Sequence, residues 1–151
     1  MIIGIDPGVS GAIVILDNGY PIDWALMPTH QVGNHKRVDP VKLLTFLDID
    51  VPIENIYIEQ VGAMPGQGVT SMFSFGHSVG TVVGVVASLC HEPIFVTPQK
   101  WKKSADLIGK GKDSSRILCK KMWPECKIFD LKIKGQAFAD AALIAYFGGK
   151  K

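Results

Sequence analysis

The chain has 151 residues and a mass of 16.4 kDa, with 47% hydrophobic and 20% charged residues, which fits one domain over residues 1–151 rather than two. Its three cysteines are odd in number and lack CxxC spacing, which argues against a disulfide framework or a zinc site and suits a reducing compartment. No basic segment precedes the first apolar residues, and the longest apolar run, Val79 to Cys90, is shorter than the roughly 20 residues of a membrane span. We therefore expect a cytoplasmic protein without signal peptide or membrane insertion.

The charges are distributed unevenly along the chain. Residues 1–99 contain three Lys/Arg and nine Asp/Glu, a net charge of −6, whereas residues 100–134 contain eleven Lys/Arg and four Asp/Glu, a net charge of +7. Clustered basic residues raise the local potential and gain from counterion release on phosphate backbones. The basic segment thus favours a polyanionic partner, although taken alone it also fits a solvated lysine surface.

The first residues predict three antiparallel strands. Ile2 to Ile5 has the pattern of a buried strand that ends at Asp6, and a tight turn leads to a second apolar run, Ala12 to Leu16. The sequence Asp17-Asn18-Gly19 predicts a hairpin turn into a third strand around Ile22 to Met27.

The next stretch predicts a loop, a helix and a strand. Pro28 to Val38 has no periodicity and is expected to be a loop, after which Asp39-Pro40 fits an N-cap followed by proline at the first helical position. The apolar positions of this helix are Val41, Leu43, Leu44 and Leu47. Asn55 to Gln60 alternates as a fourth strand, with Glu59 as its last outward residue.

A long helix is predicted from about Val69 to Cys90. Within it Gly76, Gly80 and Gly84 recur every fourth residue and so lie on one helical face. Each glycine weakens a helix interior by about 0.5–1 kcal/mol relative to alanine. We therefore expect another backbone to pack closely on this face, either that of the sheet or that of a second subunit.

The last third combines the basic segment with a final helix. Pro93 to Thr97 predicts a fifth strand, Thr97-Pro98 begins a short helix, and Asp113 or Ser114 caps the next one. A last helix is expected over Gly135 to Phe147. The order βββαβαβα predicts an α/β, ribonuclease-H-like fold, a five-stranded mixed sheet flanked by helices, with a basic helical insertion before the C-terminal helix.

Three carboxylates occupy positions that this fold buries. Asp6 and Glu59 each end an apolar strand. Asp140 lies in a predicted helix among small and apolar residues, with no lysine nearby in sequence. Burying an ionised carboxylate costs several kcal/mol unless it is paired or bound to a cation. Oxygen ligands suit Mg²⁺ or Mn²⁺, and two such ions can activate water and stabilise a leaving 3′ oxygen in phosphodiester hydrolysis. Taken singly, each acid also fits a turn, a cap or an exposed position.

Four short motifs, in this order, resemble the RuvC-type Holliday-junction resolvases, especially the short, phage-like forms within the ribonuclease-H-like nucleases. They are Ile3-Gly4-Ile5-Asp6-Pro7-Gly8, Tyr57-Ile58-Glu59-Gln60-Val61, the stretch from Val96 to Lys103, and the stretch from Ala139 to Ala145. The resemblance implies a homodimeric endonuclease that makes paired nicks in four-way DNA junctions. It also implies two Mg²⁺ ions per active site, for which Mn²⁺ can substitute, held by Asp6, Glu59 and Asp140.

The resemblance also assigns roles in the basic segment. Lys102 matches a lysine that contacts DNA near the scissile phosphate and is counted with the catalytic residues, and Lys112 lies about where a second such lysine falls. Trp101 is expected to be a packing anchor. The predicted DNA-binding residues are Lys100, Lys102, Lys103, Lys110, Lys112 and Arg116.

One departure from the family pattern concerns the metal site. Family members have a fourth ligand three residues before the C-terminal acid, where this chain has Ala137. Gln136 lies one helical turn before Asp140 on the same face and is the candidate auxiliary residue, in contact with a metal-bound water.

A second departure concerns the junction. Cellular members place a phenylalanine wedge three residues after the strand-four glutamate, where this chain has Gly62. Met64, Phe73 or Phe75 are candidate replacements, although core packing is the expected role of both phenylalanines. Sequence-selective cutting is therefore not implied.

The favoured function is a structure-selective endonuclease that resolves four-way and other branched DNA. A phosphate-loop ATPase, which the Asp-Pro-Gly turn also resembles, needs two such domains, so no nucleotide cofactor is expected. Two alternatives stay open: a ribonuclease-H-like nuclease acting on RNA–DNA hybrids or flaps, and a non-catalytic module that binds branched DNA.

Overall fold

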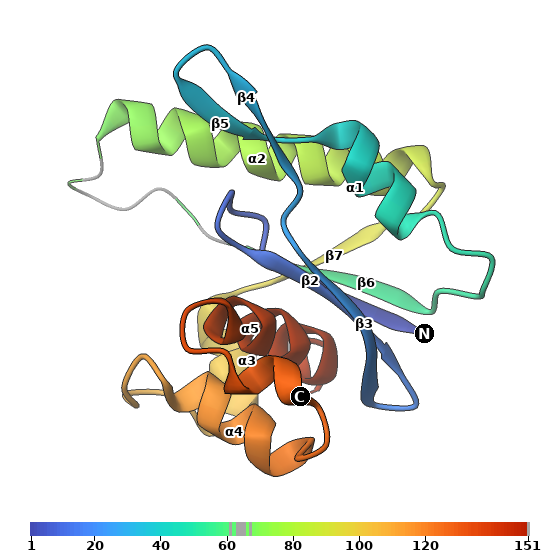
Figure 1. Cartoon of the computed structure of the whole chain (residues 1–151), viewed down its shortest axis with the longest axis vertical. Coiled ribbons are helices and arrows are strands. Elements are labelled where there is room, and N and C mark those ends of the chain that lie inside the picture. Colours follow the sequence, from blue (N-terminus) through green and yellow to red (C-terminus); the bar gives the residue numbers. More distant parts are fainter. Residues whose placement is uncertain (61, 63–65, 67, 151) are drawn as a thin grey trace.

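A five-stranded sheet forms the middle layer of the computed structural model, which describes residues 1–60, 62, 66 and 68–150 (Figure 1). The strand order is β3-β2-β1-β6-β7, with β1, β2 and β3 antiparallel and β1, β6 and β7 parallel. The strands are β1 (Ile2–Ile5), β2 (Ala12–Asp17), β3 (Tyr20–Leu26), β6 (Asn55–Glu59) and β7 (Pro93–Val96). This is the predicted mixed sheet.

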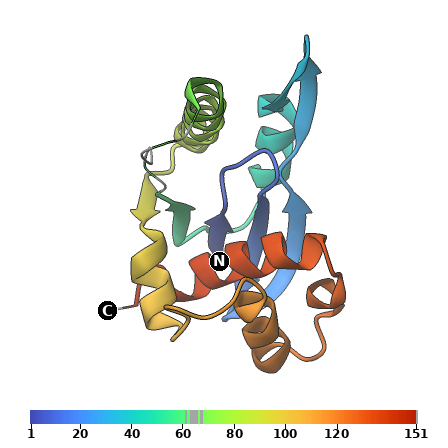
Figure 2. The same cartoon turned by 90° about the vertical axis from the view of Figure 1, so that its left-hand side faces the viewer.

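Helices cover both faces of the sheet (Figures 1 and 2). One face is covered by α1 (Pro40–Leu47) and α2 (Val69–Ser88). The other face is covered by α3 (Pro98–Ser104), α4 (Ser114–Met122), the short 3₁₀ helix η1 (Lys127–Asp130) and α5 (Lys134–Phe147). The predicted order of the five sheet strands and their flanking helices and the basic helical insertion are confirmed; η1 and the strand pair between β3 and α1 were not predicted.

The alternation of side chains along the central strands produces two separate cores. Ile3 and Ile5 of β1 and Ile56 and Ile58 of β6 point toward α1 and α2, whereas their neighbours point toward α5. Tyr57, predicted to face outward, is buried on the α5 side, since a parallel sheet with helices on both faces has no outward side.

Gly4 allows α5 to lie directly on β1. A Cβ atom at this position would overlap the backbone oxygen of Ala141 and the backbone nitrogen of Ala145. The last helix therefore approaches the first strand more closely than any side chain would allow, and this contact holds Asp140 of the same helix above the sheet.

The expected loop over residues 28–38 is instead a β-hairpin. Its strands are β4 (Thr29–Val32) and β5 (His35–Val38), joined by a turn with Gly33 at φ +56°. The hairpin extends from the body of the molecule beside α2, and most of its side chains are exposed (Figure 1). A strand pair exposed on both faces lacks apolar alternation, which is why the sequence did not reveal it.

The predicted apolar stripe of α1 is only half correct. Its Asp39 side chain accepts a hydrogen bond from the Lys42 amide, as expected of an N-cap, and Leu43 and Leu47 are buried. Val41 is 70% exposed and Leu44 37% exposed. This short helix contacts the core along one narrow line, so the flanking apolar residues remain in solvent.

The glycine face of α2 does not pack on the sheet. Among the described residues, a Cβ atom added at Gly76, Gly80 or Gly84 would meet no heavy atom within 4 Å, so the chain's own sheet is excluded as the expected neighbour. In the part of the chain that the structure describes, α2 is the one helix that is long and apolar enough to cross a membrane by length and composition. Here its Val82, Val85 and Val86 belong to the core with α1 and the sheet.

Candidate active site

The parallel pairing of β1 with β6 brings two of the three predicted acids together. The register aligns Ile5 with Ile58, so Asp6 and Glu59 follow as neighbours at the same edge of the sheet. Because Ile5 and Ile58 point toward α1 and α2, the next residue on each strand points toward α5. Asp140 is carried by α5 and completes the set.

The three carboxylates lie within electrostatic range of one another. Burial is the main cause that raises the pKa of all three, and the charge of Asp140 adds to the effect on both Asp6 and Glu59. Desolvation and the charge of Glu59 together raise the pKa of Asp6 to about 6. The site therefore concentrates negative charge where water solvates it poorly.

Neutral donors hold these acids in place. The Trp101 indole Nε1 donates to Glu59 Oε1 at 2.9 Å, and Gln136 Nε2 donates to both oxygens of Asp140 at 3.1 and 3.2 Å. The Gly8 amide lies 3.5 Å from Asp6 Oδ1. These donors lower the pKa values of the acids without adding a positive charge, so charge compensation is left to another group.

Trp101 has a second role that the sequence did not predict. It is fully buried, as expected of a packing anchor, and it also orients Glu59. Its position follows from the helix that Thr97-Pro98 begins, in which the Thr97 side chain accepts a hydrogen bond from the Lys100 amide. Ser115, also not predicted, is buried on α4 and, as a polar neighbour, lowers the pKa of Asp140.

The donor set suits a hard divalent cation. Three carboxylates supply oxygen ligands, which Mg²⁺ and Mn²⁺ prefer, and a cation would relieve their mutual repulsion. Over residues 1–60, 62, 66 and 68–150, no group of three or more His, Cys, Asp or Glu side chains is arranged so that it could hold a metal ion. The residues thus fit the ion in chemistry, but the arrangement here is not a closed metal site.

Gln136 has one atom that the protein leaves unsatisfied. Its Oε1 is buried and has no hydrogen-bond partner in the described part of the chain, while its Nε2 is occupied by Asp140. The predicted auxiliary residue therefore presents a free carbonyl oxygen beside the carboxylates. Ala137, at the position of the family's fourth ligand, offers no donor atom.

A pocket of about 400 Å³, which we call the lysine pocket, lies beside Asp140 and Gln136. Lys102, Lys110 and Lys112 line it. The Lys102 Nζ atom lies 5.2 Å from the centre of the Trp101 ring. Its positive charge lowers the pKa values of Glu59 and Asp140. No lysine is adjacent to the acids in the sequence, and α3 brings Lys102 near two of them through the tertiary fold.

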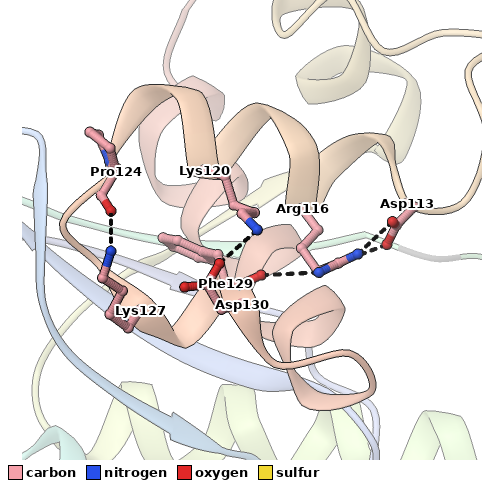
Figure 3. A network of polar contacts seen from close by, with 7 residues as sticks. All are labelled: Asp113, Arg116, Lys120, Pro124, Lys127, Phe129 and Asp130. Atoms are coloured by element: carbon pink, nitrogen blue, oxygen red, sulfur yellow. Dashed lines mark hydrogen bonds and ion pairs between the residues drawn. The ribbon is translucent and has the colours of Figure 1, made fainter.

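The other predicted DNA-binding residues divide into two groups. Lys100 and Lys103 are exposed on α3. Arg116 is largely covered, forms two hydrogen bonds with Asp113 at 2.6 and 2.8 Å, and donates to the Phe129 carbonyl oxygen (Figure 3). Its guanidinium ties α4 to η1, which gives it a structural role that the sequence did not predict.

The neighbouring charges on α4 and η1 reinforce that tie. Lys120 forms a 2.6 Å ion pair with Asp130, and Lys127 Nζ donates to the Pro124 carbonyl oxygen (Figure 3). These pairs connect the basic insertion to itself. In the lysine pocket, Lys110 forms a 2.6 Å ion pair with the exposed Asp106, and Lys112 is exposed.

The wedge candidates lie in different environments. Phe73 is 65% exposed, so its expected core role is wrong, and its ring lies 5.6 Å from the Arg37 guanidinium carbon. Phe75 is half-buried and lines a second hollow beside Gly8. Met64 lies outside the described residues.

Comparisons with known proteins find a similarity in fold, but none in sequence families. No family model matches the sequence, and no curated protein matches it. The structure is similar to that of Thermus thermophilus RuvC in complex with a Holliday junction substrate, with a TM-score of 0.69 and 13% identity over 98% of this chain and 95% of that one. A second Thermus thermophilus RuvC structure matches with a TM-score of 0.64 and 14% identity over the same shares. The chain therefore has the RuvC fold, a ribonuclease-H-like α/β arrangement, as the sequence predicted.

Proposed function

We propose that this protein is a metal-dependent endonuclease that resolves four-way and other branched DNA by paired phosphodiester hydrolysis. The observation that carries the proposal is the convergence of Asp6, Glu59 and Asp140, desolvated and mutually repelling, next to the lysine pocket. The structural similarity to RuvC bound to a Holliday junction supports a nuclease acting on junctions.

Asp6, Glu59 and Asp140 are the proposed ligands of two Mg²⁺ ions, for which Mn²⁺ can substitute. When bound, such ions activate an attacking water and stabilise the leaving 3′ oxygen. Trp101 and Gln136 fix the orientation of Glu59 and Asp140, and such outer partners contribute strongly to metal affinity. The free Gln136 Oε1 is the proposed acceptor for a water held in this site.

The lysine pocket is the proposed seat of the cleaved strand. Lys102 interacts electrostatically with both Glu59 and Asp140, so it is the residue we assign to the scissile phosphate. Lys110 and Lys112 hold the adjoining phosphates, and Lys100 and Lys103 extend the basic surface along α3. Because these contacts are to phosphates, recognition depends on DNA shape and affinity falls with salt.

The proposed active form is a homodimer joined through α2. The open face at Gly76, Gly80 and Gly84 has room for another backbone, and exposed apolar residues, including Val69 and Met72, lie on the same helix. A two-fold dimer presents two equivalent active sites, as paired nicks in a junction require. The proposed location is the cytoplasm, or the host cytoplasm if a phage encodes the protein.

The test is cleavage of an end-labelled four-way junction and of a linear duplex with the same sequence, in Mg²⁺, Mn²⁺ or EDTA. We expect symmetric, metal-dependent nicks in the junction only, and their loss in Asp6→Asn with junction binding retained. Cleavage by Asp6→Asn at the wild-type rate would show that the assignment of Asp6 to the active site is wrong. Cleavage of an RNA–DNA hybrid in preference to the junction would favour the ribonuclease alternative, and binding without cleavage would favour the non-catalytic module.

A further inference from the structure

A second hollow lies beside the turn that follows Asp6, against different elements from those that line the lysine pocket. It has a volume of about 330 Å³ and is formed between the turn after β1 and the N-terminal half of α2. Gly8, whose amide faces Asp6, is at its edge. Its hydroxyl-bearing residues are Ser10, Thr70, Ser71, Ser74 and Ser78, and we call it the hydroxyl cleft.

The hydroxyl cleft is joined to the β4–β5 hairpin by one residue. Arg37 Nη1 donates to Ser74 Oγ at 2.8 Å, and the Arg37 guanidinium carbon lies 5.6 Å from the centre of the exposed Phe73 ring. A guanidinium thus lies at the wall of the cleft, between a hydroxyl and an aromatic face. Such a combination is common where proteins hold nucleic acid.

The hairpin is basic within an acidic part of the chain. Residues 1–99 contain three Lys/Arg, and two of them, Lys36 and Arg37, are on β5. The hairpin also carries His30 and His35 and contains no Asp or Glu. The nearest acid in sequence, Asp39, caps α1, forms an ion pair with Lys42 at 3.5 Å and lies 4.0 Å from His30 Nδ1, whereas Lys36 and Arg37 are not among its partners.

The two basic regions lie at opposite ends of one side of the molecule. Figure 2 shows the hairpin at the top, α3 and α4 at the bottom, and the turn after β1 between them. Asp140 borders the lysine pocket, and the turn that holds Asp6 borders the hydroxyl cleft. A backbone in the lysine pocket and a backbone in the hydroxyl cleft would therefore pass on either side of the proposed catalytic acids.

From this arrangement we infer that the hydroxyl cleft and the β4–β5 hairpin form a second DNA-backbone site, which holds another strand of the branched substrate. The inference rests on the proposed function. Ser10, Thr70 and Ser71 are exposed and supply hydroxyl donors to phosphate and sugar oxygens. Lys36 and Arg37 supply the charge, and Phe73 supplies an aromatic face beside them.

The test is equilibrium binding of a fluorescent four-way junction and a matched duplex in EDTA, which prevents cleavage, from about 50 to 200 mM salt. Two variants address the site: Lys36→Ala/Arg37→Ala on the hairpin and Ser10→Ala/Ser71→Ala in the cleft. Two controls are on α1, where Lys42→Ala removes a positive charge and Thr45→Ala removes an exposed hydroxyl. Arg37→Lys keeps the charge in case loss of Arg37 releases the hairpin.

We expect the hairpin variant to bind the junction about tenfold more weakly than wild type. The slope of log affinity against log salt should fall by roughly one to two, because each phosphate that the variant no longer neutralises removes about one unit. The cleft variant is expected to bind about threefold more weakly without a change in slope, since hydroxyls carry no charge. The α1 controls and Arg37→Lys should stay within about twofold of wild type.

The outcomes separate the inference from the proposed function. If wild type prefers the junction but the hairpin variant matches Lys42→Ala in affinity and slope, the second site is wrong and the nuclease proposal stands. If the hairpin variant weakens junction and duplex equally and the cleft variant has no effect, the hairpin contributes only general attraction, and the inference fails. If wild type does not prefer the junction, both proposals fail.

Discussion

The three buried carboxylates lower the stability of the folded protein when they are ionised. Asp6, Glu59 and Asp140 are mostly buried, and neither their neutral donors nor Lys102, which lowers the pKa values of Glu59 and Asp140, offsets that burial, so the ionised forms are poorly solvated. A site that binds cations requires this imbalance, because an acid already paired with an internal lysine has less to gain from a metal. The consequence is a pH-dependent stability that a neutral variant would lose.

Asp6→Asn should stabilise the metal-free protein at neutral and alkaline pH. The pKa of Asp6 is about 6 in the folded protein against 3.8 for an ordinary aspartate, so the wild-type folded state binds the proton more tightly than the unfolded state. Stability from this group is therefore present below pH 3.8 and is lost as the pH rises through about 6, by about 3 kcal/mol. Urea unfolding of both proteins in EDTA at pH 4 and pH 8 measures it. A gain in Asp6→Asn that is equal at both pH values would contradict the burial of the charge.

Gln136→Ala should weaken metal binding at the site without unfolding the protein. The residue holds both oxygens of Asp140 and presents its free Oε1 beside them, and loss of such outer partners costs about 10–100-fold in metal affinity. A Mg²⁺ titration of junction cleavage should therefore shift to higher concentration. Gln99→Ala, an exposed glutamine on α3, is the control and should leave the titration unchanged. If the Mg²⁺ titration of Gln136→Ala does not shift, Gln136 has no role in metal binding.

At the scale of elements, the contact between β1 and α5 positions the site. β1 delivers Asp6, α5 delivers Asp140, and Gly4 lets the two elements approach. The helices on the other face of the sheet contribute differently. There α2 provides one wall of the hydroxyl cleft and, through Arg37, anchors the hairpin.

Gly4→Ala should destabilise the protein and displace the site together. The added methyl group would meet backbone atoms of α5, which cannot move aside as a flexible side chain would. Overpacking of this kind costs about 1–3 kcal/mol, and cleavage should fall because Asp140 moves with its helix. Gly111→Ala is the control, since open space surrounds Gly111, and its unfolding free energy should stay within about 0.5 kcal/mol of wild type. Equal stability of the two variants would show that α5 can shift at no cost.

At the scale of the whole molecule, charge and shape act together. The basic insertion lies on the α5 side of the sheet, the basic hairpin lies beside α2, and the turn after β1 is between them (Figures 1 and 2). The open glycine face of α2 gives the molecule a surface on which a second copy can pack. This surface is separate from the three carboxylates, so its test is separate.

Gly80→Leu should dissociate the proposed homodimer. A leucine side chain would occupy the space at the centre of the glycine face that a partner helix needs. Light scattering should give the mass of one chain, 16.4 kDa, for Gly80→Leu and twice that mass for wild type. Thr45→Leu, which adds a leucine to the exposed side of α1, is the control and should remain dimeric. A wild-type mass of one chain would reject α2 as a dimer interface.

The layered fold and the three acids could be predicted from the amino-acid pattern. Buried strands are continuous apolar runs, so the sequence reveals β1, β2 and β6. It also reveals the acids Asp6 and Glu59, at which the apolar runs of β1 and β6 end. Hydrogen bonds, by contrast, depend on residues that are distant in the chain. Neither the bond from Trp101 to Glu59 nor the position of Lys102 near the acids follows from any local pattern.

The roles of the exposed and charged parts became clear only in the folded chain. The hairpin has no apolar alternation to reveal it, Arg116 resembles any surface arginine until η1 packs beside it, and the α2 glycines fit either a sheet or a second chain until their neighbours are known. Burial leaves a mark in the sequence because it selects apolar residues at fixed spacing. A polar residue follows no such spacing, so its partner is known only when the fold brings the two together.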